Sequence, residues 1–170
     1  NKRVLLIDID PQGNATSGLG VDKNNLENTV YELFIDECGL EDCIQREALE
    51  HLDILPSNVN LSGAEIDLIG IDGREHILKN VLKDIQDEYD FVIIDCPPSL
   101  NILTVNAMAT ADSVLVPIQC EYYALEGLSD LLTTLRMVKK RINPQLEIFG
   151  VALTMFDGRT NFSTQVAQEV

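Results

Sequence analysis

Four mostly apolar runs constrain the fold of this 170-residue chain more than any other feature of its sequence. Such short runs, bounded by polar residues, are typical of strands that are buried on both faces in a parallel sheet. The runs cover residues 4–9, 91–94, 113–117 and 148–156. We therefore predict a parallel sheet whose strands lie inside the molecule.

Helices are expected between these strands, because apolar residues recur there at helical spacing. They are Ile77, Leu78, Val81, Leu82 and Ile85 in one segment and Leu128, Leu131, Leu132, Leu135 and Val138 in another. Shorter candidates are a strand at residues 51–55 and helices at residues 28–35, 60–68 and 161–170. The alternating order predicts an α/β fold, a doubly wound parallel sheet with right-handed crossovers, in a single domain over residues 1–170.

Acidic residues follow two of the predicted strands. Asp8 and Asp10 lie at the end of the first strand, and Asp95 comes directly after residues 91–94. Ligands of open parallel sheets bind beyond the carboxyl ends of the strands, so we expect these acids to face one crevice. Magnesium prefers one or two carboxylates together with waters and phosphate oxygens, which makes this crevice a candidate site for Mg²⁺ and a nucleotide phosphate.

Asp8 and Asp10 alternate along one strand end, so the pleat is expected to point both side chains to the same face before Pro11 ends the ladder. Two like charges at such proximity favour a bound cation or a division of roles. One acid would help to hold Mg²⁺ while the other orients an attacking water, as phosphoryl transfer requires. The residues leave an alternative open, in which all three acids are solvated or helix-capping carboxylates at a sheet edge.

The charge balance excludes several functional classes. With 12 Lys and Arg against 28 Asp and Glu, the formal net charge of −16 disfavours polyanion binding over most of the chain. Only residues 131–170, with 5 basic and 3 acidic side chains, offer a basic face.

No apolar run approaches the ~20 residues of a membrane-spanning helix and no secretory leader is recognisable, so a cytoplasmic protein is expected. The four cysteines form no C-x-x-C pair and are expected to be buried free thiols.

Four separated motifs resemble those of one protein family. They are VLLIDIDPQGNATSGLG at residues 4–20, YDFVIIDCPPSL at residues 89–100, PIQCEYYALEG at residues 117–127 and LTMFDGRTN at residues 153–161. In this order they are similar to the ParA/Soj family of chromosome- and plasmid-partitioning ATPases, over essentially the whole chain. The resemblance implies a P-loop NTPase-like three-layer sandwich.

The resemblance also implies roles for the three acids. Asp10 resembles the switch I aspartate that supports hydrolysis, Asp8 resembles the acid that reaches Mg²⁺ through water, and Asp95 resembles the Walker B acid. ATP and Mg²⁺ are the implied cofactors. In the family, ATP binding closes a homodimer that binds DNA non-specifically, and a ParB/Spo0J-like partner stimulates hydrolysis. A nucleoid-associated protein that needs no membrane is therefore expected.

Residues near the carboxyl end of the chain are candidates for contacts with DNA and adenine. Arg159 resembles a DNA-contacting arginine of the family and lies in the net-positive part of the chain. The alternative is that Arg159 is an ordinary surface arginine beside Asp157. The basic residues 139–141 are weaker candidates, because cations at a helix end are favoured by the helix dipole in any case. Thr154 and Met155 follow a predicted strand and lie in the expected vicinity of the adenine.

The chain departs from the family where phosphates are bound. ParA-type proteins begin with a strand and a deviant P-loop of the form Lys-Gly-Gly-x-Gly-Lys-[Thr/Ser], and the 170 residues contain no such loop. Without its backbone cradle and two lysines, the phosphates lose their main electrostatic ligands. We therefore expect this chain by itself to be inactive toward ATP, as a ParA-type domain cut before its P-loop and within its carboxyl-terminal part.

Three other interpretations fit parts of the sequence. A MinD-type division-site ATPase shares the fold and the acids but binds membranes through a terminal amphipathic helix. A phosphoacceptor receiver domain would require an acceptor acid at a strand end, whereas Asp53 opens its apolar run, and a lysine that residues 113–119 lack. A non-enzymatic binding module would explain the absent P-loop, but it gives no reason for the retained acids.

Overall fold

Two units make up the chain in the computed structural model, residues 1–107 and residues 108–170. The structure describes residues 2–120 and 124–159, with the backbone alone at residues 86 and 124–126. Each unit contains its own sheet, and the single domain expected over residues 1–170 stays a prediction.

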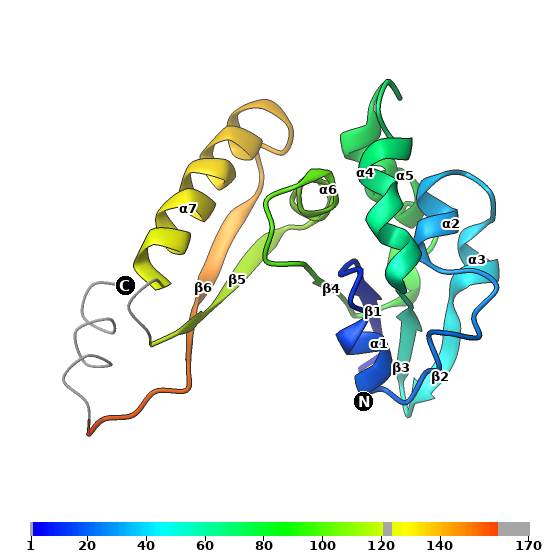
Figure 1. Ribbon diagram of the computed structural model, residues 1–170, viewed down its shortest axis with the longest axis horizontal. Coiled ribbons are helices and arrows are strands. Elements are labelled where there is room, and N and C mark those ends of the chain that lie inside the picture. Colours follow the sequence, from blue (N-terminus) through cyan, green and yellow to red (C-terminus); the bar gives the residue numbers. More distant parts are fainter. Residues whose placement is uncertain (1, 121–123, 160–170) are drawn as a thin grey trace. The chain divides into compact units, whose positions relative to one another are not determined.

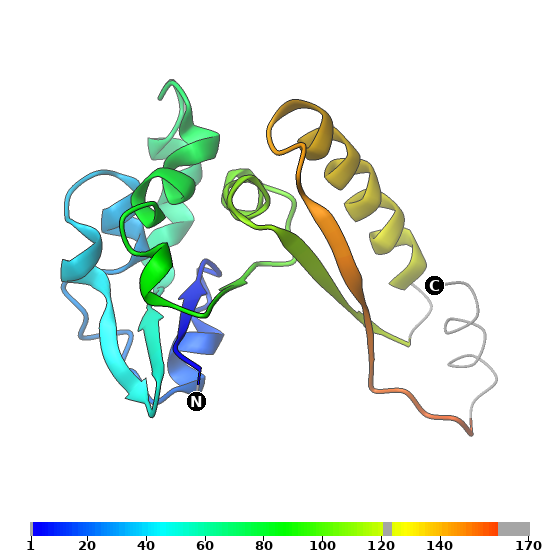
Figure 2. The same cartoon turned by 180° about the vertical axis from the view of Figure 1, so that it is seen from behind.

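The first unit is built on a mostly parallel sheet (Figure 1). Its strands are β1 (Val4–Asp8), β2 (Gln45–Leu49), β3 (Leu52–Leu55) and β4 (Phe91–Asp95). Their order is β2-β3-β1-β4, and β1 pairs in parallel with both β3 and β4. The sequence predicted these three strands and their direction. It did not predict β2, a polar edge strand that runs antiparallel to β3 and lies beside it in Figure 2.

Short helices connect the strands of the first unit. They are α1 (Asn14–Gly18), α2 (Val30–Phe34), α3 (Leu40–Cys43), α4 (Ala64–Asp67), α5 (Ile77–Leu82) and α6 (Ile102–Thr110), with 3₁₀ turns η1 (Val59–Gly63), η2 (Arg74–His76) and η3 (Gln86–Glu88). The helices predicted at residues 28–35 and 77–85 correspond to α2 and α5. The one predicted at residues 60–68 is divided between η1 and α4.

α6 was not predicted from the sequence. It begins with a polar cap, and the boundary between the two units falls within it. The Asn101 side chain accepts hydrogen bonds from the backbone N–H groups of Leu103 and Thr104, at 3.0 and 3.2 Å, as an N-cap does. Further along, the amide of buried Asn106 accepts from Leu78 N at 3.2 Å and donates to Arg74 O at 2.8 Å. Hydrogen bonds therefore fix α6 against the start of α5.

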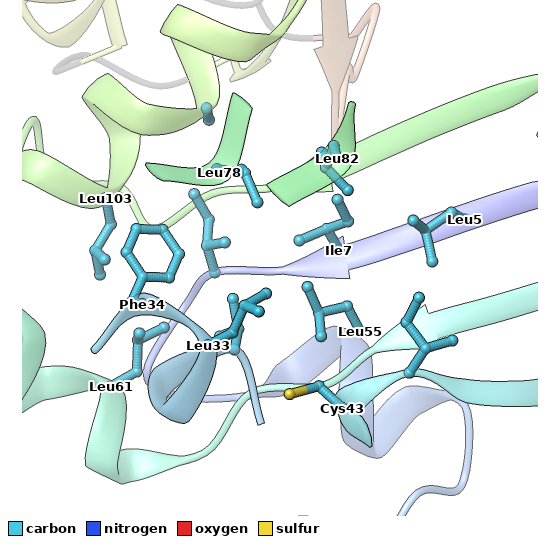
Figure 3. Packing of buried hydrophobic residues seen from close by; sticks show 14 of the residues in the cluster. Leu5, Ile7, Leu33, Phe34, Cys43, Leu55, Leu61, Leu78, Leu82 and Leu103 are labelled. Atoms are coloured by element: carbon cyan, nitrogen blue, oxygen red, sulfur yellow. The ribbon is translucent and has the colours of Figure 1, made fainter. Parts of the chain in front are cut away.

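The core of the first unit lies between β1 and the surrounding helices (Figure 3). Its labelled residues are Leu5 and Ile7 of β1, Leu33 and Phe34 of α2, Cys43 of α3, Leu55 of β3, Leu61 of η1, Leu78 and Leu82 of α5, and Leu103 of α6. Each is at most 4% exposed, so this one cluster joins every layer of the unit. Burial of this kind supplies most of the stabilisation of such a fold.

One expectation about the strands was wrong. We expected every apolar run to be buried on both faces, but β4 is buried on one face only, since Phe91 is 57% and Ile93 is 54% exposed. The alternate residues Val92 and Ile94 pack against the core. In the part of the first unit that is described, nothing covers the outer face of β4.

The second unit has two parallel strands and one long helix. β5 (Ser113–Gln119) pairs with β6 (Glu147–Thr154), and α7 (Ala124–Arg141) packs along them. These elements correspond to the strands and the helix predicted for this part of the chain. The helix predicted at residues 161–170 and the motif residues 121–123 lie outside the described residues.

The helices differ from membrane-spanning segments in length and composition. None of the helices formed by residues 2–120 and 124–159 has both the length and the hydropathy to cross a bilayer.

Buried Asp53 is the centre of an ionic network at the amino ends of the strands, whose cation, Arg46, is partly exposed. Its Oδ2 accepts hydrogen bonds from Tyr89 Oη at 2.8 Å and from Arg46 Nη1 at 3.1 Å. Its Oδ1 accepts from Glu47 N at 2.7 Å. Arg46 also forms a bidentate pair with Glu41, at 2.8 and 2.7 Å. Asp53 thus attaches the edge strand β2 to β3 and is a structural residue, which disfavours the receiver-domain interpretation.

These contacts shift two pKa values. Burial opposes the charge of Asp53, but the hydrogen bonds from Glu47, Tyr89 and Arg46 outweigh it and hold the pKa below 3.8. Burial, followed by the hydrogen bond to Asp53, raises the pKa of Tyr89 to about 12. Because the folded pKa of Asp53 is lowered, its contribution to stability is present above 3.8 and is lost as the pH falls through the folded value.

We expect Asp53→Ala to lower the free energy of unfolding by about 1–3 kcal/mol, because it leaves the buried Tyr89 hydroxyl without its acceptor and removes one partner of Arg46. Denaturant unfolding at neutral pH measures this loss. Glu41→Ala is the matched control: it removes the exposed partner of the same arginine and should change the free energy by only about 0–1 kcal/mol. Equal losses for the two variants would contradict the assignment.

Candidate functional site

Asp8 is the innermost acid at the carboxyl end of β1. Its side chain is completely buried, and its Oδ2 accepts hydrogen bonds from Thr16 N and Thr16 Oγ1, both at 2.8 Å. Its Oδ1 accepts from Asp10 N at 3.1 Å. A carboxylate oxygen has two lone-pair sites, so Oδ2 is saturated and Oδ1 retains one. Asp8 can therefore reach an ion or a water only through Oδ1.

A chain of buried hydrogen bonds extends from Asp8 to the end of β3. Thr16 Oγ1 accepts from Ser57 N at 3.0 Å, and Ser57 Oγ donates to the carbonyl oxygen of Asp10 at 2.8 Å. Thr16 and Ser57 are both fully buried. This network joins the ends of two neighbouring parallel strands to α1, and it fixes the backbone position of Asp10.

The turn after Asp10 depends on a glycine. Gln12 N donates to Asp10 Oδ1 at 3.0 Å and Gly13 N donates to Asp10 O at 2.8 Å, which closes a tight turn before α1. Gly13 has a φ of 58°, and a Cβ at this position would lie 2.8 Å from Ser57 O. Any side chain here would displace the backbone beside the acids.

The structure places Asp10 differently from the sequence-based argument. That argument put Asp8 and Asp10 on one face of a strand, but β1 ends at Asp8 and Asp10 belongs to the turn. The alternation of a strand therefore does not orient Asp10. Its Oδ1 supports the turn, whereas its Oδ2 accepts no hydrogen bond from residues 2–120 or 124–159. That oxygen is available to accept a hydrogen bond from a water or a ligand.

Asp95 lies beside Asp8 on the neighbouring strand. The two residues are register partners in the parallel pair of β1 and β4, about 4.8 Å apart at the backbone by ordinary sheet geometry. The pKa of Asp95 is raised, first because the protein displaces water from its carboxylate and second because Asp8 and Asp10 are negatively charged. The predicted meeting of two acidic strand ends is thus confirmed for Asp8 and Asp95.

These acids fit a hydrated magnesium ion. Mg²⁺ binds hard oxygen ligands, keeps several waters and usually takes one or two carboxylates together with phosphate oxygens. Burial, followed by repulsion from Asp8 and Asp10, raises the pKa of Asp95, and a cation would relieve that repulsion. Across the described parts of the chain, no three His, Cys, Asp or Glu side chains form a metal cage by themselves. A site completed by water and phosphate is consistent with both observations.

The other predicted site residues belong to the second unit. Thr154 ends β6, and its hydroxyl donates to Ile118 O at 3.2 Å. Met155 follows with a φ of 53° and is 79% exposed. Arg159 is exposed and forms an ion pair with Asp157 at 2.7 Å. This ion pair raises the pKa of Arg159 and lowers that of Asp157, so the arginine charge is partly neutralised.

Two residues of the acidic site were not predicted as members. Thr16 lies within the first motif, but its spacing from Asp8 does not indicate their contact. Ser57 follows the short strand β3 and Pro56, so the rule that ligand residues follow strands is sufficient to find it. Ser57 could therefore have been predicted from the strand expected at residues 51–55, whereas no pattern in the sequence indicated Thr16.

Comparison with known proteins shows the family of this chain. A family model described as an AAA domain matches residues 1–148. The chain is 54% identical over 169 residues to the sporulation initiation inhibitor protein Soj of Bacillus subtilis (strain 168), covering 99% of the chain and 67% of Soj. It is 49% identical to the chromosome partitioning protein ParA of Myxococcus xanthus (strain DK1622), covering 99% of the chain and 60% of ParA. The chain thus spans about two thirds of the length of these relatives.

Solved structures share the fold. A cobyrinic acid a,c-diamide synthase from Mycobacterium smegmatis, with a bound ATP analog and magnesium, is 39% identical with a TM-score of 0.93, covering 100% of this chain and 69% of the synthase. A plasmid partition protein from Borrelia burgdorferi is 27% identical with a TM-score of 0.85, covering 99% of this chain and 72% of that protein. With its family match and its identity to Soj and ParA, the chain belongs to the AAA-domain family and, within it, to the ParA/Soj partitioning ATPases.

Proposed function

We propose that the complete protein is a DNA-partitioning ATPase that uses Mg²⁺ and ATP. The observation that carries this proposal is the pairing of Asp8 and Asp95 at adjacent strand ends, in a chain 54% identical to Soj. The magnesium and ATP analog named for the M. smegmatis structure support the choice of cofactors. The names of the Soj and ParA relatives support the choice of DNA partitioning as the process.

Each acid has a distinct part in this proposal. When bound, Mg²⁺ would neutralise charge that develops on the transferred phosphoryl group. Asp95 would hold waters of the ion, and Asp8 would reach the same waters through its remaining Oδ1 site. Asp10 would orient the attacking water with Oδ2, because Oδ1 is engaged by Gln12 N and the backbone carbonyl is engaged by Ser57.

The proposed cycle involves a second copy, DNA and a partner protein. ATP would close a homodimer that binds DNA without sequence preference, and a ParB/Spo0J-like partner would stimulate hydrolysis to release it. Arg159 is the proposed DNA contact in the net-positive part of the chain. Thr154 and Met155 are proposed to lie near the adenine. A nucleoid-associated protein in the cytoplasm follows from this cycle.

One of the solved structures is named for a different reaction. The M. smegmatis structure is named as a cobyrinic acid a,c-diamide synthase, at 39% identity. We favour partitioning, since the relatives named Soj and ParA are 54% and 49% identical to this chain. Stimulation of ATP hydrolysis by DNA and a ParB-like protein, without conversion of cobyrinic acid, would agree with partitioning. The reverse result would favour the synthase.

The 170-residue chain alone is expected not to bind ATP at micromolar concentrations, because its sequence contains no P-loop to cradle the phosphates. Titration with Mg·ATP in a calorimeter measures this directly. The comparison is the same chain preceded by a strand and a deviant P-loop of the ParA type, which should restore binding. Micromolar affinity of the chain alone would contradict the prediction.

Asp10→Ala in the complete protein is expected to preserve ATP-dependent dimerisation and to slow hydrolysis by about 10²–10⁴-fold, because Asp10 acts mainly in the transition state. Asp10→Asn is the matched variant. It keeps an oxygen for the turn contact with Gln12 but removes the negative charge. Similar slowing in both variants would indicate a chemical role, whereas wild-type turnover in Asp10→Asn would reduce Asp10 to a turn residue.

Arg159→Glu is expected to weaken DNA binding at low salt and to leave nucleotide affinity unchanged, because the charge would repel phosphates. The slope of log affinity against log salt should fall by about 1 for each phosphate that the variant no longer binds. Arg159→Lys retains the charge and serves as the control. Asp157→Asn should not weaken binding, since it releases Arg159 from its ion pair. An unchanged salt slope for Arg159→Glu would exclude Arg159 as a DNA ligand.

A further inference from the structure

Two cysteine thiols meet in the first unit, and neither belongs to the acidic site. Cys38 Sγ lies 2.7 Å from Cys43 Sγ, although both residues are free thiols. A disulfide bond is about 2.05 Å long, so a shift of less than about 1 Å would bring the sulfurs to bonding distance. Sequence spacing does not reveal this pair, because the two residues do not form a C-x-x-C motif.

The local backbone explains the meeting. Asp36 takes a φ of 63° and ends α2, and Glu37 N donates to Glu32 O at 2.9 Å across that turn. The chain then reverses at Gly39, whose N–H donates to Asp42 Oδ2 at 3.2 Å as α3 begins. Cys38 before the reversal and Cys43 at the end of α3 are thereby held face to face.

The two thiols differ in access. Cys43 is completely buried in the hydrophobic core and donates to Gly39 O at 3.3 Å. Cys38 is half-buried and packs against the same core from outside. Cys38 is therefore the thiol that a small oxidant reaches first, and Cys43 is positioned to react with it.

A metal site is a poorer account of this pair. Soft metals require additional ligands beyond two thiolates in most protein sites, and the described residues offer no third His, Cys, Asp or Glu to complete one. Burial raises the pKa of both thiols, with acidic neighbours such as Glu32 adding to the effect. Protonated thiols are weak metal ligands and slow nucleophiles, so oxidation here would depend on proximity.

We propose that Cys38 and Cys43 are an oxidation site, at which hydrogen peroxide converts the thiol pair into an intramolecular disulfide. The Cys38 thiol gives up its proton as its sulfur attacks one peroxide oxygen, the O–O bond breaks, and the departing hydroxide takes up that proton and leaves as water, so that Cys38 becomes a sulfenic acid. The Cys43 sulfur then attacks the Cys38 sulfur, the S–O bond breaks, and a second water leaves with the thiol proton. Two thiols lose two electrons and two protons in total, and one peroxide becomes two waters.

The disulfide would act on the edge of the sheet. Cys43 is followed directly by Ile44 and by β2, which is held to β3 through Arg46 and Asp53. A bond from Cys43 to Cys38 would fasten the end of α2 to the segment that leads into this edge strand. Oxidation would therefore restrict the α2–α3 connection.

The test is peroxide treatment of the purified chain, followed by thiol titration and digestion without reductant. The titratable thiols in denaturant should fall from four to two, and dithiothreitol should restore them. Cleavage after Glu37, Glu41 and Glu47 separates the two cysteines, so residues 38–41 and 42–47 should be recovered as one disulfide-linked pair, lighter by two hydrogen atoms than the separate peptides. Linkage of either peptide to Cys96 or Cys120 instead would overturn the proposal.

Three variants complete the test. Cys43→Ala should stop the reaction at Cys38 sulfenic acid, which dimedone traps. Cys38→Ser should form no disulfide within the chain. Because this variant keeps the buried Cys43, it tests the proposal even if Cys43→Ala does not fold. Cys96→Ser should still form the link, because its exposed thiol takes no part. Over-oxidation of Cys38 in the native chain without a link to Cys43 would also refute the proposal.

Discussion

The buried carboxylate of Asp8 is the interaction on which the site depends. A charged group with no exposure is stable only when its oxygens are hydrogen bonded, and Asp8 obtains these bonds from Thr16 and the Asp10 backbone. Thr16 in turn accepts from Ser57, so one carboxylate determines how β1, α1 and the end of β3 meet. The position of Asp10, the proposed base, follows from that arrangement. Asp8 is therefore both a structural anchor and a neighbour of the proposed ion.

The elements that the sequence predicted well are those with strong periodicity. The apolar runs of β1, β4, β5 and β6 were recognisable because residues of each strand pack into a hydrophobic core. β2 could not be found in this way, since it is a polar edge strand held by the side chain of Arg46. α6 was missed for the opposite reason, because its residues are apolar on several sides and show little helical periodicity. Its start is fixed by the Asn101 cap, a contact that becomes clear only in three dimensions.

The acidic site shows the same division between local pattern and tertiary contact. The predicted strand ends indicated that Asp8 and Asp95 are neighbours, because parallel strands bring their carboxyl ends to one edge of the sheet. The alternation argument failed for Asp10, since the strand ends two residues earlier and a glycine turn takes over. Ser57 follows a predicted strand and could have been found from that position, but its hydrogen bond to Thr16, 41 positions away, becomes visible only in three dimensions. Charge counting located the basic part of the chain but could not show that Arg159 is paired with Asp157.

The half-covered strand β4 has a consequence for the behaviour of the chain in solution. β4 is the last strand of its sheet, so along its outer edge the described residues supply no strand partner for its amide and carbonyl groups. Phe91 and Ile93 are exposed on the same strand, and an unprotected apolar edge is a template for pairing with another strand. The net charge of −16 opposes such pairing by repulsion between chains. Salt weakens that repulsion and leaves the apolar attraction in place, so ionic strength sets the colloidal stability of the chain.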